Sequence, residues 1–466
     1  MCPQTVADDG ALILATATEA VAPEVLDDLA LTYDREVRHV SVTDGDLEIL
    51  IERLVVSAER GVEVTRTGTD DDLVSDVRDL ASQPPVIRFV NMLLRDAFDA
   101  GASDIHVEAT RDGLAVRYRL DGVLAPAPEP SFDLRHAVVS RIKLLADLDI
   151  AERRRPQDGR IRVRLENRDL DVRVSTVPTM HGESVVMRLL ERGGRPIELA
   201  ALGLGAALLP HVESVVARPH GMLLVTGPTG SGKTTTLYAA LNRRAASREK
   251  IITVEEPIEY QLAGIAQVPV HRDAGVTFAT ALRSILRQDP DVVMIGEMRD
   301  AETTEIAVQA ALTGHLVLST LHTNDALSAI PRLQDLGAPE FLIAATIEGV
   351  LAQRLVRKIC DVCAVTEDVD DASLAELAGR PMRRMPVRRG IGCRACRGTG
   401  YSGRTGIFEF LRMTDAMRDA ITRRASRTEL REVALADGFV PMQADAWTRV
   451  QQGLTTVEEA LRVVRH

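Results

Sequence analysis

The segment GPTGSGKT, residues 227–234, has the residue types and spacing of a loop that binds phosphate groups. Backbone N–H groups of such a loop, and of the helix that follows it, point toward the phosphates. Lys233 would contact the β- and γ-phosphates, and the hydroxyl of Thr234 would bind Mg²⁺. We therefore predict a site for ATP and Mg²⁺ formed by Gly227, Pro228, Thr229, Gly230, Ser231, Gly232, Lys233, Thr234 and Thr235.

Three further apolar segments are each followed by a polar cluster. After IITV, VVMI and HLVLST, these clusters contribute Glu255, Glu256, Glu259, Glu297 and His322. The carboxyl ends of parallel strands meet at one edge of a doubly wound sheet. We expect these side chains to surround the γ-phosphate, where one can position water and another can hold the metal. Taken singly, each cluster is also explained by a helix cap or a loop ion pair, and the sequence leaves open which glutamate is the general base.

Four of the five cysteines form two CxxC pairs, separated by 29 residues. Four thiolates presented by two tight turns are typical of a structural zinc site with tetrahedral geometry. Because all four ligands come from the protein, the ion would stabilise the fold and would not catalyse a reaction. The alternative is a set of free thiols or a redox pair. The predicted zinc ligands are Cys360, Cys363, Cys393 and Cys396.

The charge of the chain is unevenly distributed. Residues 1–80 contain 19 acidic residues and 6 arginines, whereas the net charge of the whole chain is −12. Such an acidic segment indicates a basic protein surface as its partner and argues against nucleic acid, although a solvated acidic face is the simpler explanation. A secretion signal and a run of 18 apolar residues are both absent from the sequence. We therefore expect a cytoplasmic protein, at most peripheral to a membrane.

The pattern of apolar residues divides the chain into five units. Residues 1–80 form an acidic N-terminal docking domain, with a helical pattern at 46–58 and a linker at 66–76. Residues 84–195 combine a helix at the start, alternating strands and a second helix at 133–148, which indicates a small α+β domain. Short apolar strands such as MLLVT and DVVMIG then alternate with helices, which indicates a parallel sheet covered on both faces. This α/β core is expected at 197–352, the cysteine segment at 353–405 and a helical region at 406–466.

Together these segments resemble the ATPases of bacterial type II secretion and type IV pilus assembly, from about residue 84 to the C-terminus. GPTGSGKTTTLY resembles the Walker A motif of that family and LRQDPDVVMIGEMRD its Walker B region. TVEEPIEY resembles its aspartate box, although Glu255-Glu256 replaces the usual Glu-Asp. TGHLVLSTLHTNDA resembles its histidine box, with His315 and His322 as catalytic candidates. SDIHVE, RYRLDGVL and PQDGR resemble the domain before the ATPase core.

The resemblance implies a homohexameric ring of RecA-like P-loop ATPase cores, each preceded by a small PAS-like α+β domain. Nucleotide would bind between the core and that domain, whose Arg160 and Arg173 would reach the phosphates. Arg283 and Arg287 are further charge-stabilising candidates. The segments GVLAQRLVRKIC and HGESVVMRLL are closer to type II secretion than to pilus assembly. We therefore predict an ATP-hydrolysing motor for type II secretion, which docks on inner-membrane components at the cytoplasmic face.

Three alternatives remain open at this point. The first is a type IV pilus assembly (extension) ATPase. The second is a nucleic-acid translocase, suggested by the basic segments AERRRPQDGRIRVRLENR and MRRMPVRRGIGCRACRG. An aromatic content of 3% leaves few side chains for base stacking, so no nucleic acid is expected. The third is a scaffold that binds ATP without hydrolysis, which the intact Lys233, Thr234 and acidic clusters argue against.

Overall fold

The computed structural model describes most of the chain from residue 83 onward and three short segments before it. The described residues are 2–6, 12–16, 37–41, 83–165, 168–191, 197–244, 248–369, 372–381 and 385–465. The helix expected at 46–58, the linker expected at 66–76 and most of the acidic unit 1–80 lie outside them. Across the described ranges, none of the helices combines the length and apolarity needed to span a bilayer.

The three N-terminal segments form one small sheet. Strand β2 pairs with β1 in antiparallel and with β3 in parallel orientation. The strands are β1 (Cys2–Val6), β2 (Leu12–Thr16) and β3 (Val37–Ser41).

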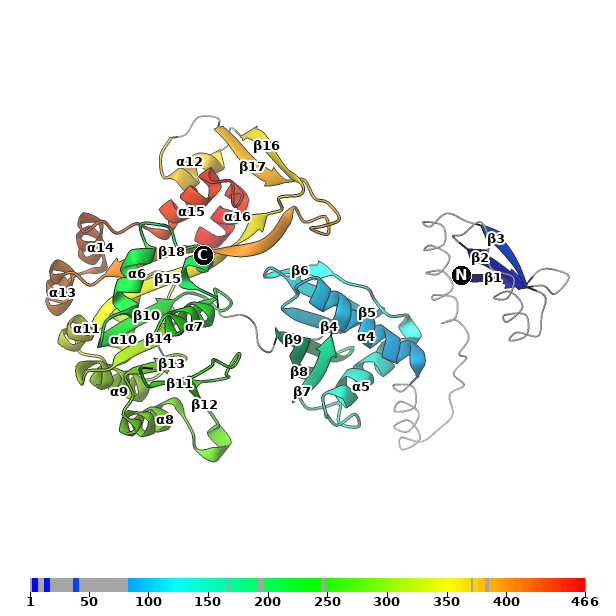
Figure 1. Cartoon of the computed structure of the whole chain (residues 1–466), viewed down its shortest axis with the longest axis horizontal. Helices are drawn as coiled ribbons and strands as arrows, with labels where there is room; N and C mark the ends of the chain where they lie inside the picture. The colour runs from blue at the N-terminus through cyan, green and yellow to red at the C-terminus, as the bar shows by residue number, and fades with distance from the viewer. Residues whose placement is uncertain are drawn as a thin grey trace.

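The second unit is a six-stranded antiparallel sheet covered by two helices (Figure 1). On β5, Leu114, Val116 and Tyr118 are buried against the helices, and the residues between them face away, as the two-residue period of a strand requires. The strand order is β6-β5-β4-β9-β8-β7. The elements are α4 (Pro84–Asp99), β4 (Asp104–Thr110), β5 (Gly113–Leu120), β6 (Val123–Pro126), the 3-10 helix η2 (Phe132–Leu134), α5 (Arg135–Leu145), β7 (Gln157–Leu165), β8 (Arg168–Thr179) and β9 (Gly182–Glu191).

A buried ion pair fixes the end of α5 against this sheet. The ammonium of Lys143 donates hydrogen bonds to Glu183 Oε1 and to the carbonyl of Glu152, each at 2.7 Å. The side chain of Lys143 is 1% exposed, so both of its partners are needed to offset the cost of removing the charge from water. The pair holds the loop that leads into β7, the strand that carries Arg160.

The third unit is a seven-stranded sheet in which β12-β11-β13-β14-β10-β15 are parallel and β18 is antiparallel at one edge. Its strands are β10 (Gly221–Thr226), β11 (Ile251–Glu255), β12 (Ala266–Pro269), β13 (Val292–Ile295), β14 (Leu316–Leu321), β15 (Ile347–Ile359) and β18 (Tyr401–Arg412). Successive residues of β10 belong to different hydrophobic clusters: Met222 packs into one, Leu223 into the other. The expectation of a parallel sheet covered on both faces is confirmed.

Helices cover both faces of this sheet (Figure 1). One cluster includes α6 (Leu209–Val216), α7 (Lys233–Arg243) and the 3-10 helix η3 (Leu199–Leu202). The other includes α8 (Phe278–Ile285), α9 (Ala301–Leu312), α10 (Ala329–Asp335) and α11 (Glu340–Thr346). Two further 3-10 turns are η4 (Arg272–Ala274) and η5 (Leu286–Gln288).

The C-terminal part of the chain shares the core of the third unit. Strand β15 continues past residue 352 to Ile359, and β18 returns from the cysteine segment to pair with it. The expected boundaries at 352 and 405 therefore fall inside strands, because pairing between distant segments leaves no local mark in the sequence. Between the two strands lie β16 (Ala364–Val369), α12 (Ala372–Ala378) and β17 (Met385–Gly390). After them come α13 (Asp415–Thr422), α14 (Arg427–Ala436), α15 (Met442–Gln451) and α16 (Val457–Val464), which pack into the same cluster as α8 to α11.

Candidate nucleotide-binding site

The glycine-rich loop 227–232 connects β10 to the first turn of α7. Gly230 and Gly232 have φ angles of 78° and 86°, in the left-handed region that glycine adopts without strain. A Cβ atom on Gly227 would lie 2.3 Å from the carbonyl oxygen of Gln353 on β15. The loop therefore lies so close to the neighbouring strand that no other residue fits at this position.

The loop and the first turn of α7 carry polar side chains that can bind phosphate. Among the described residues, the buried hydroxyl of Ser231 has no hydrogen-bond partner. The ammonium of Lys233 donates to the carbonyls of Gly227 (2.8 Å) and Pro228 (3.0 Å) within the loop itself. Burial lowers the pKa of Lys233 to about 8, with Glu297 opposing the shift, so the side chain stays mainly protonated at neutral pH. These residues fit a triphosphate, and the hydroxyl of Thr234 at the start of α7 is available for Mg²⁺.

Glu297 and His322 come together beside the loop. They follow the neighbouring strands β13 and β14, and Glu297 Oε2 lies 3.3 Å from His322 Nε2. The other carboxylate oxygen of Glu297 lies 2.5 Å from Nη2 of Arg299, a residue that the sequence motif contains but that we did not single out. Partial burial and the cation of Lys233 lower the pKa of His322, while Glu297 opposes the shift. This shift favours the neutral form of the imidazole.

Glu255 and Glu256 are adjacent in sequence but have different surroundings. Glu255 is buried at the end of β11, where it accepts hydrogen bonds from Thr253 Oγ1 (2.6 Å), Gln267 Nε2 (3.1 Å) and the hydroxyl of Tyr238. These three donors take most of the acceptor sites of its carboxylate. Glu256 accepts two hydrogen bonds from Arg272, at 2.8 and 2.9 Å, and that interaction lowers the pKa of Glu256.

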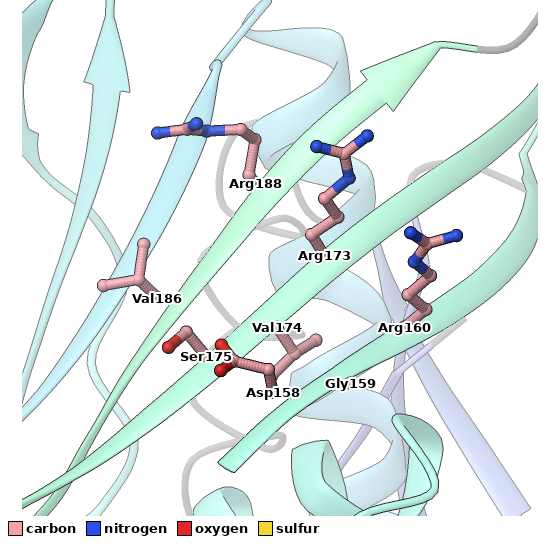
Figure 2. Close-up of a pocket in the computed structure, with 8 residues that line it drawn as sticks. All are labelled: Asp158, Gly159, Arg160, Arg173, Val174, Ser175, Val186 and Arg188. Carbon is pink, nitrogen blue, oxygen red and sulfur yellow. The ribbon is translucent and has the colours of Figure 1, made fainter. Parts of the chain in front are cut away.

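Three arginines lie side by side on one face of the six-stranded sheet (Figure 2). The strand register pairs Arg160 with Arg173 and Arg173 with Arg188, so the row crosses β7, β8 and β9. The arginines line a cavity of about 420 Å³. Arg188 was not predicted, because its place in the row depends on pairing between strands and not on a motif. Its Nε donates to Asp104 at 2.9 Å.

Arg173 connects this row to the seven-stranded unit. Its Nη2 donates to the carbonyl of Ile258 at 3.0 Å, within the acidic segment after β11. Burial lowers the pKa of Arg173; Glu259 opposes that shift, and Arg160 adds to it. A row of cations that includes a partly buried guanidinium favours binding of an anionic group.

Three other predicted residues lie elsewhere. His315 precedes the amino end of β14, where its ring contacts the carbonyl of Ala310 at 3.0 Å, at the edge of the sheet opposite the loop. The histidine box spans a whole strand, so its two histidines fall at opposite ends. Arg283 pairs with Glu302 at 2.7 Å, and Arg287 donates to Ser284 at 3.2 Å; both arginines are exposed on α8 and η5.

The four paired cysteines form one cluster. Their Sγ atoms all lie within 4.8 Å of one another, and three of the separations are 3.7, 3.8 and 3.9 Å. A tetrahedral zinc ion bound by four thiolates separates the sulfurs by about 3.8 Å. Backbone N–H groups of Cys393 and Gly400 donate to Cys396 Sγ at 3.1 and 3.2 Å, and they lower the pKa of that thiol although burial opposes the shift. The donors and their spacing fit a tetrahedral metal ion such as zinc.

A parallel sheet with a glycine-rich loop between its central strand and a helix, and with acidic and imidazole groups at the same edge, defines a P-loop ATPase fold. The sequence matches the family described as Type II/IV secretion system protein over residues 79–462. The chain belongs to this family, as the resemblance of its motifs predicted.

The relatives cover most of the chain. It is 49% identical to Type II secretion system protein HxcR of Pseudomonas aeruginosa, over 91% of this chain and 89% of that protein. It is 51% identical to Type II secretion system protein E of Xanthomonas campestris, over 85% of this chain and 70% of that protein. Identity to the type IV pilus assembly ATPase PilB of Myxococcus xanthus is 42%, over 94% and 79%.

A solved structure has the same fold. The pilus retraction motor PilT with bound ADP aligns with a TM-score of 0.53 and 26% identity, over 80% of this chain and 96% of PilT. The expected α/β fold, with an ATPase core preceded by a small α+β domain, is confirmed by this likeness and by the two sheets described above.

We expect the purified protein to contain one zinc ion per chain, and Cys396→Ser to lose it, because three thiolates leave the site open. Metal content measured by plasma mass spectrometry tests this. Cys2→Ser is the matched control and should retain the metal, since Cys2 lies on β1 and outside the cluster. A wild-type protein without bound metal would contradict the assignment.

We expect the pKa of His322 to lie below 6.5. Lys233→Ala should raise it, because a neighbouring cation is removed, and Glu297→Gln should lower it further, because a neighbouring anion is removed. As the pH falls from the pKa of His322 in the unfolded chain to its lower pKa in the folded chain, the unfolded state binds more protons than the folded state. The contribution of His322 to the stability of the folded state therefore decreases as the pH falls through this range. NMR titration of the imidazole signal, assigned with His322→Asn, measures the pKa; no change in Lys233→Ala would show that the two groups do not interact.

Proposed function

We propose that this protein is the ATPase of a type II secretion system, which hydrolyses ATP to ADP and phosphate to power protein export. The observation that carries the proposal is the pairing of Glu297 with His322 near Lys233, the residue that follows the glycine-rich loop. The names of the relatives with 49 and 51% identity support the choice of machine.

In the proposed reaction, Glu297 positions the water that attacks the γ-phosphate. Its carboxylate accepts hydrogen bonds only, and Arg299 and His322 hold it in place. Glu297 interacts electrostatically with Lys233, which places its carboxylate near the phosphate loop. Glu255 instead accepts from Thr253, Gln267 and Tyr238 at the end of β11, and Glu256 accepts from Arg272. We therefore assign the general-base role to Glu297. Neutral His322 would keep that carboxylate oriented.

Positive charge would stabilise the transition state from two sides. Lys233 and the N–H groups of the loop act from the core, and Mg²⁺ held by Thr234 would neutralise phosphate charge when bound. Arg160 and Arg173 act from the preceding domain, with Arg188 extending the row. Glu259, beside Arg173, would position that arginine. We leave His315, Arg283 and Arg287 out of this mechanism, because their contacts lie away from the loop.

The working unit that we propose is a homohexameric ring, with nucleotide between the core and the preceding domain. Closure of that domain over ATP would convert hydrolysis into motion. The proposed units are a docking domain at 1–80, an α+β domain at 84–195 and an ATPase core that begins at 197. The zinc segment expected at 353–405 and the helical region expected at 406–466 belong to this core through β15 and β18. The acidic docking domain would bind an inner-membrane secretion component at the cytoplasmic face, so that the chain itself is only peripheral to the membrane.

A type IV pilus assembly ATPase is the second candidate, because PilB aligns with 94% of this chain. Its identity of 42% is lower than that of the two type II relatives, and we therefore place it second.

Glu297→Gln should reduce kcat for ATP hydrolysis by about 10²-fold or more, with little change in KM, because the amide cannot accept the proton of the attacking water. Glu256→Gln is the matched control, and its kcat should fall by less than about tenfold. Steady-state kinetics on the assembled protein measures both. The opposite order of the two variants would transfer the general-base role to Glu256.

Replacement of the native gene by Lys233→Ala should abolish secretion of folded enzymes into the culture medium and leave surface pili intact. Enzyme activity in the supernatant and electron microscopy of pili give the two readouts. Loss of pili with intact secretion would favour the pilus ATPase. A strain with both functions intact would exclude either motor.

A further inference from the structure

The segment 397–404, which follows the second CxxC pair, contacts the six-stranded domain at two points. Arg397 Nη2 donates to Asp96 Oδ1 at 3.1 Å, and Arg404 Nε lies 3.3 Å from Asp121 Oδ1. Asp96 lies on α4, and Asp121 lies in the turn between β5 and β6. Because the contacts involve two separate elements, they resist rotation of the domain about either one.

Asp121 makes a second contact with the segment in addition to its ion pair with Arg404. Its second oxygen, Oδ2, accepts a hydrogen bond from the backbone N–H of Gly403 at 2.9 Å. Asp121 is the first residue of the two-residue turn between β5 and β6, and its φ angle of 48° lies in the left-handed region. The arginines at both contact points remain partly exposed, so each ion pair by itself contributes little.

The middle of the same segment is fixed by the cysteine cluster. The N–H of Gly400 donates to Cys396 Sγ at 3.2 Å, and the carbonyl of Gly400 accepts from the N–H of Cys360 at 2.9 Å. The hydroxyl of Thr399 donates to the carbonyl of Cys396 at 2.7 Å. The conformation of 397–404 therefore depends on how the four sulfurs are held.

The turn at Asp121 also lies at the nucleotide site. Together with Gly122 it borders a cavity of about 230 Å³, on the other side of which is the phosphate loop. The phosphate-loop residues that line this cavity are Pro228, Thr229, Gly230 and Ser231, and Arg354 and Arg404 also line it. The contact made by 397–404 is thus at the position where the arginine-bearing domain meets the loop.

We propose that the metal site acts through 397–404 to set the orientation of the six-stranded domain over the phosphate loop, with Asp96 and Asp121 as positioning residues. The effect on catalysis rests on the proposed ATPase function, whereas the contact itself does not. A small displacement of this domain would move Arg160 and Arg173 away from the phosphates, since both are carried by the same sheet.

The test compares Asp121→Arg, Arg404→Asp and the double charge swap in the full-length protein, with Asp96→Arg as a second site. Each single variant should retain its zinc and lose hydrogen-exchange protection at 113–126 and 397–404. Each should also lower kcat by a factor on the order of ten, and the double swap should recover most of both losses. Arg389→Asp is the matched control: it breaks the 2.7 Å pair with Glu367 within the cysteine segment and should change neither kcat nor these peptides.

Removal of zinc from the wild-type protein with a chelator should lower hydrogen-exchange protection at 113–126 and 397–404. In the Asp96→Arg/Asp121→Arg variant, zinc removal should cause no further loss of hydrogen-exchange protection at 113–126, because the contacts with 397–404 are already broken. The proposal is overturned if Asp121→Arg, or the milder Asp121→Asn should the first not fold, matches wild type in exchange and kcat. If the wild-type protein hydrolyses no ATP, the proposed function fails, and the exchange measurements still decide the contact.

Discussion

Close packing of the glycine loop against β15 is the constraint on which the nucleotide site depends. A Cβ atom at Gly227 or Gly232 would lie 2.3 or 2.9 Å from atoms of Gln353. Gln353 follows the point where Ala352 pairs with Thr226, the last residue of β10, so the register of two parallel strands sets the distance. Its side chain also accepts a hydrogen bond from Thr236 on α7, at 2.5 Å. One residue thus contacts both the loop and α7, the helix that follows it.

The same strand extends from the ATPase core to the cysteine cluster. β15 has 13 residues and ends at Ile359, immediately before Cys360. From Gln353, which contacts the loop, to Cys360 the chain covers seven residues, or about 23 Å at about 3.3 Å per residue, so one strand connects the two sites. Its partner β18 begins at Tyr401, within the segment 397–404 that contacts the six-stranded domain, and carries Gly403 and Arg404. The cysteine cluster is therefore built into the sheet that supports the phosphate loop and is not an appended module.

The charges of the site are separated between two units. The core carries Glu297, which is 9% exposed and held by Arg299 and His322. The six-stranded domain carries a row of arginines on the face opposite its helices, with Asp104 as a neighbouring counter-charge. Phosphate groups placed between these units would be neutralised only when the two come together. In the ATPase that we propose, this arrangement would make catalysis sensitive to the relative orientation of the two units.

The amino-acid sequence determined the features that are local in the chain. The loop 227–234, the two CxxC pairs and the short apolar strands are each recognisable from neighbouring residues, because the chemistry and the strand period act over a few positions. Only the tertiary structure decided which side chains from distant segments come together. Examples are Glu297 with His322, Arg188 with Arg160 and Arg173, and Asp121 with Arg404. The tertiary structure also separated His315 from the loop and joined β18 to β15 across 41 intervening residues, 360–400. Strand register and chain reversal decide such contacts, and both depend on pairing between segments that are distant in the sequence.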